Sequence, residues 1–140
     1  MNGIKLVSAC LCGISCRYDG RSKPVDRFVR MLRSGECVPF CPEILGGLAT
    51  PREPAIISGG DGYSVLDGTG KVILRDVPGD VTEEFLRGAG IAVRYARLVN
   101  PVCIYLKEKS PSCGLYCGDN VPGVAAAALV RSGFRVEAVN

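Results

Sequence analysis

The chain contains no histidine, and this absence removes a large part of ordinary protein chemistry. Serine–histidine nucleophiles, cysteine–histidine nucleophiles and histidine-ligated metals are all excluded. Acid–base catalysis must use Glu, Asp, Lys, Tyr or Cys, and a transition metal must be held mainly by thiolates. Cys-x-x-Cys pairs are also absent, which counts against zinc ribbons, thioredoxin-type redox motifs and ordinary ferredoxins.

Long apolar runs and a strong net charge are missing too. No apolar stretch reaches the roughly 18 residues needed to span a bilayer, and no signal peptide precedes the first strand-like stretch. We therefore expect a cytoplasmic protein with no membrane partner. The net charge of +3 is too small to indicate nucleic-acid binding by itself. A tRNA partner stays open because four arginines could share one face: Arg21, Arg27, Arg30 and Arg33.

The pattern of apolar runs and Gly or Pro breaks predicts strands alternating with helices. Such an order is typical of an α/β fold, a single domain whose mainly parallel sheet has helices on both faces. A turn rich in Asp and Gly between 63–66 and 71–74 predicts a β-hairpin insertion, and 49–62 is expected to be loop. A capping-box pattern at Asp80–Glu83 predicts a helix start. The expected strands are 5–9, 37–41, 102–106 and 134–139, and the expected helices are 24–34, 80–98 and 123–130.

Eight cysteines are present, and in a cytosolic chain so many indicate metal or redox chemistry rather than disulfides. Cys10, Cys41 and Cys113 each lie at or just beyond the carboxyl end of a predicted strand. Parallel strands share one carboxyl edge, where open α/β sheets bind their ligands. We therefore expect these thiols to converge.

The remaining cysteines have other expected roles. Cys37 and Cys103 belong to predicted strands and are expected to be buried small hydrophobic residues. Cys12 is expected to point away from Cys10. Cys16 lies in the first loop as a candidate fourth ligand or working thiol, and Cys117 is a weaker candidate for either role.

Three converging thiolates without histidine favour an iron–sulfur cluster or a zinc ion. A cubane cluster needs four ligands, so three protein ligands would leave one iron open to an exogenous ligand. An open iron would be a Lewis acid with an affinity for sulfur. On spacing alone, buried free thiols remain an alternative.

Several long motifs give the chain a resemblance to the thiouracil desulfidase family, over nearly its whole length. They are Ser8-Ala9-Cys10-Leu11-Cys12-Gly13, Cys16-Arg17-Tyr18-Asp19-Gly20, Cys41-Pro42-Glu43 with Ile44 to Leu48, Thr50-Pro51-Arg52, and Lys107-x-x-Ser110-Pro111-Ser112-Cys113-Gly114. The resemblance implies that residues 1–140 form one desulfidase-like domain.

The resemblance also implies a [4Fe-4S] cluster whose ligands would be Cys10, Cys41 and Cys113. The family's activity is removal of sulfur from a thiolated pyrimidine without net redox change. The substrate would be thiouracil, a thiouridine nucleotide or a tRNA thiouridine. Glu43 would match the acidic catalytic residue and Ser110 the active-site serine, with Ser112 as the alternative serine.

Glu43 could activate the water that attacks the thiocarbonyl carbon, or it could merely cap the next turn or pair with Arg17. Asp19 could bind a pyrimidine NH, or belong only to a turn. The segment from Leu115 to Pro122 is shorter than is usual in the family, which leaves substrate identity open. The competing hypotheses are a zinc-binding structural module and a sulfur carrier or tRNA-modification partner.

Overall fold

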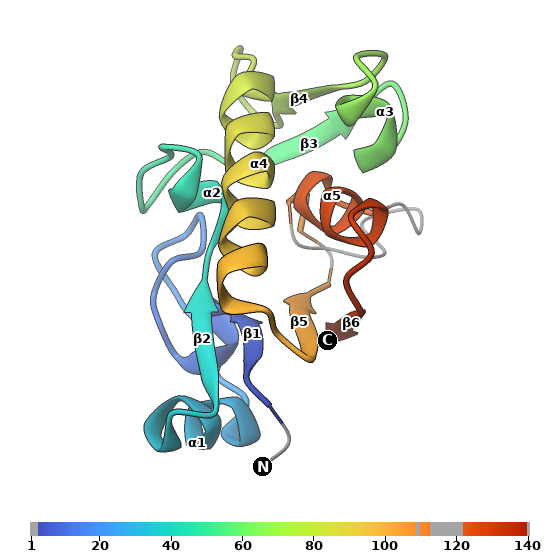
Figure 1. Cartoon of the computed structure of the whole chain (residues 1–140). Coiled ribbons are helices and arrows are strands. Elements are labelled where there is room, and N and C mark those ends of the chain that lie inside the picture. The colour runs from blue at the N-terminus through green and yellow to red at the C-terminus, as the bar shows by residue number, and fades with distance from the viewer. Residues whose placement is uncertain (1–2, 109, 113–121, 140) are drawn as a thin grey trace.

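A parallel sheet of four strands forms the centre of the molecule (Figure 1). The computed structural model describes residues 3–108, 110–112 and 122–139. The strands are β1 (Lys5–Ser8), β2 (Cys37–Phe40), β5 (Cys103–Lys107) and β6 (Val136–Val139). They lie in the order β2-β1-β5-β6, and every neighbouring pair is parallel. The predicted mainly parallel α/β fold is confirmed.

The position of each strand in the sheet agrees with its sequence. In the register of the sheet, Val7 of β1 lies opposite Pro39 of β2 on one side and Tyr105 of β5 on the other. Proline cannot donate a hydrogen bond to a sheet, and β2 tolerates it because β2 is an edge strand.

Helices cover both faces of this sheet, as predicted. On one face lies α1 (Asp26–Ser34), whose buried Phe28 joins the core cluster that contains Val7. This helix ends at Gly35, which has a positive φ of 76° and confirms the predicted stop.

The opposite face is covered by α4 (Thr82–Val99) and α5 (Val124–Arg131). Small side chains such as Ala92 and Ala126 pack in one core cluster with Leu6 of the sheet. In the part of the chain that the structure describes, no helix combines the length and apolarity that crossing a membrane requires.

The hairpin insertion differs from its prediction. It pairs β3 (Ala55–Ser58) with β4 (Lys71–Leu74) in antiparallel fashion, so its first strand comes from the expected loop. The predicted strand 63–66 is wrong, because Gly62–Leu66 forms the helix α3. Asp61 accepts a hydrogen bond from the Ser64 amide, and the Ser64 hydroxyl accepts one from the Asp61 amide, which starts this helix.

The start of α4 also needs a correction. Its N-cap is Val81, so the predicted capping box does not form. Instead the Asp80 carboxylate accepts a hydrogen bond of 2.9 Å from the Thr82 amide. The Thr82 hydroxyl accepts one of 2.9 Å from the Val72 amide, which ties the helix to β4.

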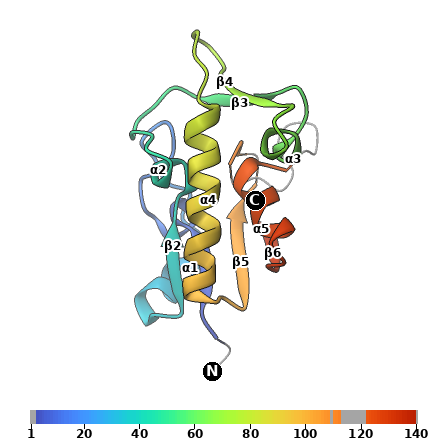
Figure 2. The ribbon, with the colours of Figure 1, turned by 45° about the horizontal axis from the view of Figure 1, so that its top comes forward.

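The helix α4 is long enough to pack against both the hairpin and the sheet (Figures 1 and 2). The helix starts beside β4, where Phe85 packs with Val72 and Val124, and then continues along the sheet. A short helix, α2 (Pro42–Leu45), follows β2 and lies against α4. The hairpin and α2 are therefore fixed to the same rigid helix.

Candidate functional site

The carboxyl ends of β1 and β5 lie side by side at the centre of the sheet, and their chains then diverge. After β1 the chain enters the 3₁₀ helix η1 (Ala9–Cys12) and then α1, whereas α5 follows β5 on the opposite face. The Lys107 amide donates a hydrogen bond of 3.0 Å to the hydroxyl of the buried Ser8. This bond joins the ends of β1 and β5 at the switch point in strand order, where open α/β sheets bind ligands.

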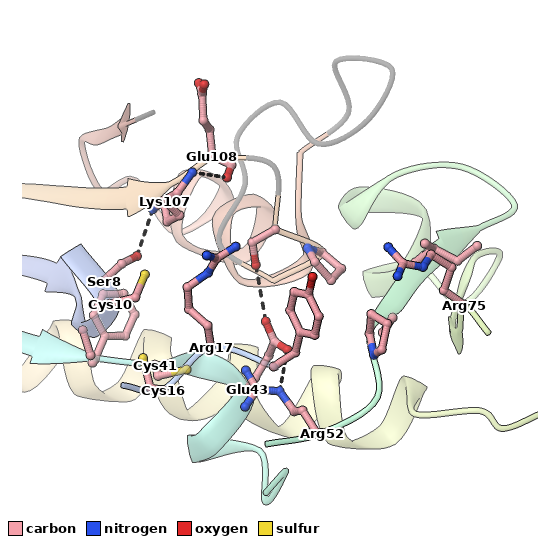
Figure 3. Close-up of a pocket in the computed structure, with 18 residues that line it drawn as sticks. Ser8, Cys10, Cys16, Arg17, Cys41, Glu43, Arg52, Arg75, Lys107 and Glu108 are labelled. Atoms are coloured by element: carbon pink, nitrogen blue, oxygen red, sulfur yellow. Dashed lines mark hydrogen bonds and ion pairs between the residues drawn. The ribbon is translucent and has the colours of Figure 1, made fainter. Parts of the chain in front are cut away.

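A cavity of about 300 Å³ opens at this edge, between the sheet and the β3–β4 hairpin. Its lining is drawn in Figure 3. The polar and sulfur-bearing side chains in the lining come from distant parts of the sequence: Ser8, Cys10, Cys16, Arg17, Tyr18, Cys41, Glu43, Arg52, Arg75, Lys107, Glu108 and Ser110.

Three of these lining residues are cysteines. Cys10 belongs to η1, Cys41 is the N-cap of α2, and Cys16 lies in the loop between η1 and α1. Figure 3 shows the Cys16 and Cys41 sulfurs next to each other at one end of the cavity. The structure therefore brings two predicted ligands, Cys10 and Cys41, to one place together with the candidate Cys16.

The thiols interact closely enough to affect one another's ionisation. Hydrogen bonding with the Cys10 thiol, together with burial, raises the pKa of Cys16 to about 11. The Cys16 thiol and then burial raise the pKa of Cys41. In the described ranges, no group of three Cys, Asp or Glu side chains is arranged to hold a single metal ion. Cys113, the third predicted ligand, lies outside those ranges, as does Cys117.

Glu43 faces the same cavity from α2, and its two carboxylate oxygens have different partners. One oxygen, Oε1, accepts a hydrogen bond of 3.0 Å from Arg52 Nε. The other, Oε2, accepts bonds from the hydroxyls of Ser112 at 2.8 Å and Ser110 at 3.3 Å. The acidic residue and both serines of the motif are thus in direct contact. Ser110 lines the cavity, whereas Ser112 is buried behind it.

Arg52 is the site residue whose role the sequence analysis missed. The expected alternative partner of Glu43 was Arg17, but the ion pair forms with Arg52, and only 9% and 13% of the two side chains are exposed. Arg52 Nη1 also donates to the Ala49 carbonyl at 3.0 Å and to the Thr50 hydroxyl at 3.2 Å. The Thr50-Pro51-Arg52 motif was the available signal, because this turn aims the guanidinium back at α2.

Further cations surround the cavity. Burial and the nearby Arg17 lower the pKa of Lys107, whose ammonium group donates to the Glu108 carbonyl at 3.2 Å. Arg75 approaches from the hairpin side and is paired with the exposed Asp76. The site therefore combines buried thiols, one carboxylate with two hydroxyls, and an excess of positive charge.

Comparison with known proteins identifies the family of this chain. The sequence model described as 2-thiouracil desulfurase matches residues 6–139. The chain belongs to the 2-thiouracil desulfurase family. It is 42% identical over 144 residues to the uncharacterized protein YbbK of Bacillus subtilis (strain 168), covering 96% of this chain and 95% of that protein.

A solved structure with the same fold is described as TudS, a [4Fe-4S]-dependent thiouracil desulfidase. The two chains superpose with a TM-score of 0.82 at 34% identity, covering 97% of this chain and 90% of the other. This desulfurase-family chain therefore shares its fold with a protein named for cluster-dependent sulfur removal.

Asp19, the other predicted site residue of this desulfurase-family member, lies outside the cavity lining, as do Cys12, Cys37 and Cys103. Asp19 accepts a hydrogen bond of 3.0 Å from the Arg21 amide, as in a turn. Cys37 and Cys103 are buried, as expected, and Cys12 is buried as well. Burial, followed by the neighbouring Cys37, raises the pKa of Cys12 to about 12, so these two thiols form a separate pair.

Proposed function

We propose that this chain is a [4Fe-4S]-dependent desulfidase that converts the thiocarbonyl of a thiolated pyrimidine into a carbonyl. Water supplies the oxygen, hydrogen sulfide leaves, and no electrons are transferred. The observation that carries the proposal is the meeting of Cys10 and Cys41 with Glu43 in one cavity at the carboxyl edge of the sheet. Membership of the 2-thiouracil desulfurase family supports the substrate class.

The side chains around the cavity suit an iron–sulfur cluster. Thiolates are the ligands that such clusters prefer, and Cys10 and Cys41 lie at the cavity wall. Arg17 and Lys107 line the same cavity, and their positive charges would balance the negative charge of a thiolate-held cluster. Cys10, Cys41 and Cys113 would hold the cluster, which supplies a Lewis-acidic iron with an affinity for the thiocarbonyl sulfur.

Glu43 would act as the base that takes a proton from the attacking water. Arg52 binds Oε1, so Oε2 is the carboxylate oxygen on the side of the serines. Ser110 lines the cavity and contacts Glu43, so its hydroxyl can orient the water or the pyrimidine ring. Ser112 supports Glu43 from the buried side.

The cavity volume of about 300 Å³ suits a ligand the size of one pyrimidine. Arg17 and Lys107 provide positive charge for a nucleotide phosphate, so the proposal includes the nucleotide as well as the free base. The proposal includes a cytoplasmic location for the protein, because thiolate ligands require reduced cysteines.

The first test is anaerobic reconstitution followed by incubation with 2-thiouracil, 4-thiouracil, 4-thiouridine monophosphate and 4-thiouridine-containing tRNA. Loss of thiocarbonyl absorbance with release of sulfide is the expected result. Iron with acid-labile sulfide separates the proposal from a zinc-binding structural module, which would contain zinc alone. A sulfur carrier would retain the sulfur as a persulfide instead of releasing it.

The second test replaces Glu43 with Gln in the loaded protein. Loss of a positioned base lowers kcat by about 10²–10⁴-fold, while the iron and sulfide content stays that of the wild type. Glu53→Gln is the matched control, because Glu53 is exposed and outside the cavity lining. Full turnover of the Glu43→Gln protein would remove this residue from the mechanism.

A further inference from the structure

The described lining of the cavity contains two aromatic side chains, Phe40 and Tyr18, and they are held in different ways. Phe40 is the last residue of β2, and only 4% of it is exposed, because it packs in the core cluster that contains Leu6. Tyr18 lies in the loop between η1 and α1 and is 36% exposed. Of these two rings, Tyr18 is therefore the one that is open to a ligand in the cavity.

The backbone around Tyr18 is held by hydrogen bonds within its own turn. The Arg17 amide donates to the Arg21 carbonyl at 3.2 Å, and the Gly20 amide donates to the Arg17 carbonyl at 2.9 Å. The Asp19 carboxylate accepts a hydrogen bond of 3.0 Å from the Arg21 amide. The turn thus fixes the point from which the Tyr18 ring extends, and a tyrosine side chain has only two torsion angles left to order when it contacts a ligand.

A further contact ties Tyr18 to the carboxylate that is proposed to activate water. The Tyr18 carbonyl accepts a hydrogen bond of 2.7 Å from the Arg52 amide. The Arg52 side chain in turn donates to Glu43 Oε1 at 3.0 Å. A flat ligand resting on the Tyr18 ring would therefore be held in a fixed position relative to Glu43, and attack of a water molecule on one carbon of that ligand requires such positioning.

The Tyr18 ring is also less occupied by its neighbours than another partly exposed tyrosine of the chain. The Arg131 guanidinium lies over the Tyr63 ring, 5.0 Å from its centroid. The cation beside Tyr18 is Arg17, and it lies 6.0 Å from the ring centroid, which is the outer limit for a cation–π interaction. Packing within the chain therefore explains the position of the Tyr63 ring better than that of the Tyr18 ring.

We propose that the Tyr18 ring stacks on the pyrimidine ring of the substrate and thereby makes the protein selective for flat aromatic thiocarbonyl compounds. This inference rests on the proposed function. Aromatic rings attract one another in offset stacks, and an aromatic side chain can stack on any base because every base has a π face. A thiocarbonyl compound with a puckered ring would lose this contact, although its sulfur atom would be unchanged.

The experiment compares 2-thiouracil or 4-thiouracil, whichever reacts faster, with its own 5,6-dihydro derivative, which carries the same thiocarbonyl on a puckered ring. Sulfide release by the reconstituted protein gives the ratio of kcat/KM for the two compounds. Tyr18→Leu should lower this ratio about tenfold relative to wild type, which is near the low end of the effect of removing one stacking ring. Tyr18→Phe keeps the ring and should keep the ratio. The two compounds also differ in intrinsic reactivity, but that difference is the same for every variant.

Binding of the unreactive compounds uracil and 5,6-dihydrouracil provides a second readout that needs no turnover. In isothermal titration calorimetry of the reconstituted protein, Tyr18→Leu should weaken uracil binding about tenfold and dihydrouracil binding much less. Tyr63→Leu is the matched control, because Tyr63 also has an arginine beside its ring but lies on α3, outside the cavity lining. This control should bind both compounds like the wild type.

The outcomes separate this inference from the proposed function. Sulfide release by the wild type, combined with an unchanged kcat/KM ratio in Tyr18→Leu, would overturn the stacking role and leave the desulfidase intact. An equal fall of the ratio in Tyr18→Phe would also contradict it, because that variant retains the ring. Wild-type protein that releases sulfide from no thiolated pyrimidine would overturn both proposals. Tyr18→Met is a second variant without a ring, and it takes the place of Tyr18→Leu if the leucine variant does not fold.

Discussion

The Glu43 carboxylate is divided between a cation on one side and two hydroxyls on the other. Arg52 binds Oε1 at 3.0 Å, and the Ser112 hydroxyl binds Oε2 at 2.8 Å. This division fixes the plane of the carboxylate, so we infer that Arg52 positions Glu43 for the proposed reaction. The guanidinium group of Arg52 is in turn held by its hydrogen bonds to the Ala49 carbonyl and the Thr50 hydroxyl.

Replacement of Arg52 with Ala should lower kcat by about 10²-fold, the cost of misplacing a catalytic group by about 1 Å. The loss of one partner from a largely buried ion pair should also destabilise the fold by about 3–5 kcal/mol. Added guanidinium ion at low concentration should restore part of the rate in this variant, because it can refill the vacated site beside Glu43. Steady-state kinetics with and without guanidinium provide the measurement.

Two further variants serve as controls for the rescue of Arg52→Ala by guanidinium ion. The same additive should do nothing for Glu43→Gln, which lacks the carboxylate to be positioned. Arg52→Lys should keep the charge but lose the fork, and its kcat should lie between those of wild type and Arg52→Ala. Equal kcat in wild type and Arg52→Ala would contradict a positioning role.

Among the elements, α2 owes its place to a close approach of two backbones. A Cβ atom added to Gly88 of α4 would lie 2.0 Å from the Pro42 carbonyl oxygen, and one added to Gly46 would lie 2.0 Å from the Glu84 carbonyl oxygen. The absence of a side chain at Gly88 thus permits α2 to pack closely against α4. Because Cys41 and Glu43 belong to this segment, the glycine contact positions the site.

Gly88→Ala should therefore destabilise the protein by about 1–3 kcal/mol, because the clash with backbone exceeds the gain in helix propensity. Gly90→Ala in the same helix is the control, since an added Cβ there meets no atom within 4 Å. That control should be stabilised by up to about 1 kcal/mol. Urea unfolding of both variants tests the pair, and a stable Gly88→Ala protein would exclude the close contact.

The start of α4 predicts a dependence of stability on pH. Hydrogen bonds from the Thr82 hydroxyl and amide lower the pKa of Asp80 below its ordinary value of 3.8. A carboxyl group with a lowered pKa stabilises the fold above its unfolded value and loses that contribution as pH falls through its folded value.

Asp80→Ala should therefore have a lower Tm than wild type at pH 7, with the gap narrowing as the pH falls below 3.8. Asp80→Asn keeps an acceptor oxygen for the Thr82 amide but cannot ionise, so it should retain part of the stabilisation without this change below pH 3.8. Thermal unfolding monitored by circular dichroism across this range is the measurement. A gap between wild type and Asp80→Ala that stays constant would show that the carboxylate contributes nothing.

The same elements show where sequence reasoning succeeds and fails. The buried strands β1 and β5, and the stop at Gly35, follow from local patterns that the tertiary structure reinforces. The stretch 63–66 is β-capable, yet Asp61 and Ser64 start a helix there by satisfying each other's amides. Propensity over four residues is a weak signal, and local hydrogen bonding outweighed it.

For the molecule as a whole, topology made the site predictable while side-chain pairing did not. The rule that parallel strands share one carboxyl edge is sufficient to place Cys10 and Cys41 together. The Arg52–Glu43 pair could not be inferred in this way, because the turn that aims Arg52 at α2 depends on local backbone geometry. Arg17 was the expected alternative partner of Glu43 because it also carries positive charge. Charge alone does not specify which arginine side chain points toward Glu43.

Cluster loading should stabilise the entire fold, because the proposed ligands join segments that are far apart in sequence. Cys10 follows β1, Cys41 follows β2, and Cys113 follows β5. A group that binds only the folded state adds about 4 kcal/mol at a thousandfold excess over its dissociation constant. For a chain of this length, that corresponds to a rise in Tm of about 10 °C.

Anaerobic calorimetry of the reconstituted and cluster-free proteins measures this rise. Cys41→Ser should show little of it, because the variant loses a ligand, whereas Cys37→Ser should show all of it. Cys37 is a sound control, since its thiol is buried against Phe28 on the face covered by α1 and outside the cavity lining. If loading left the Tm of the wild type unchanged, the cluster could not be joining these three segments, and the ligand set would have to be sought elsewhere in the chain.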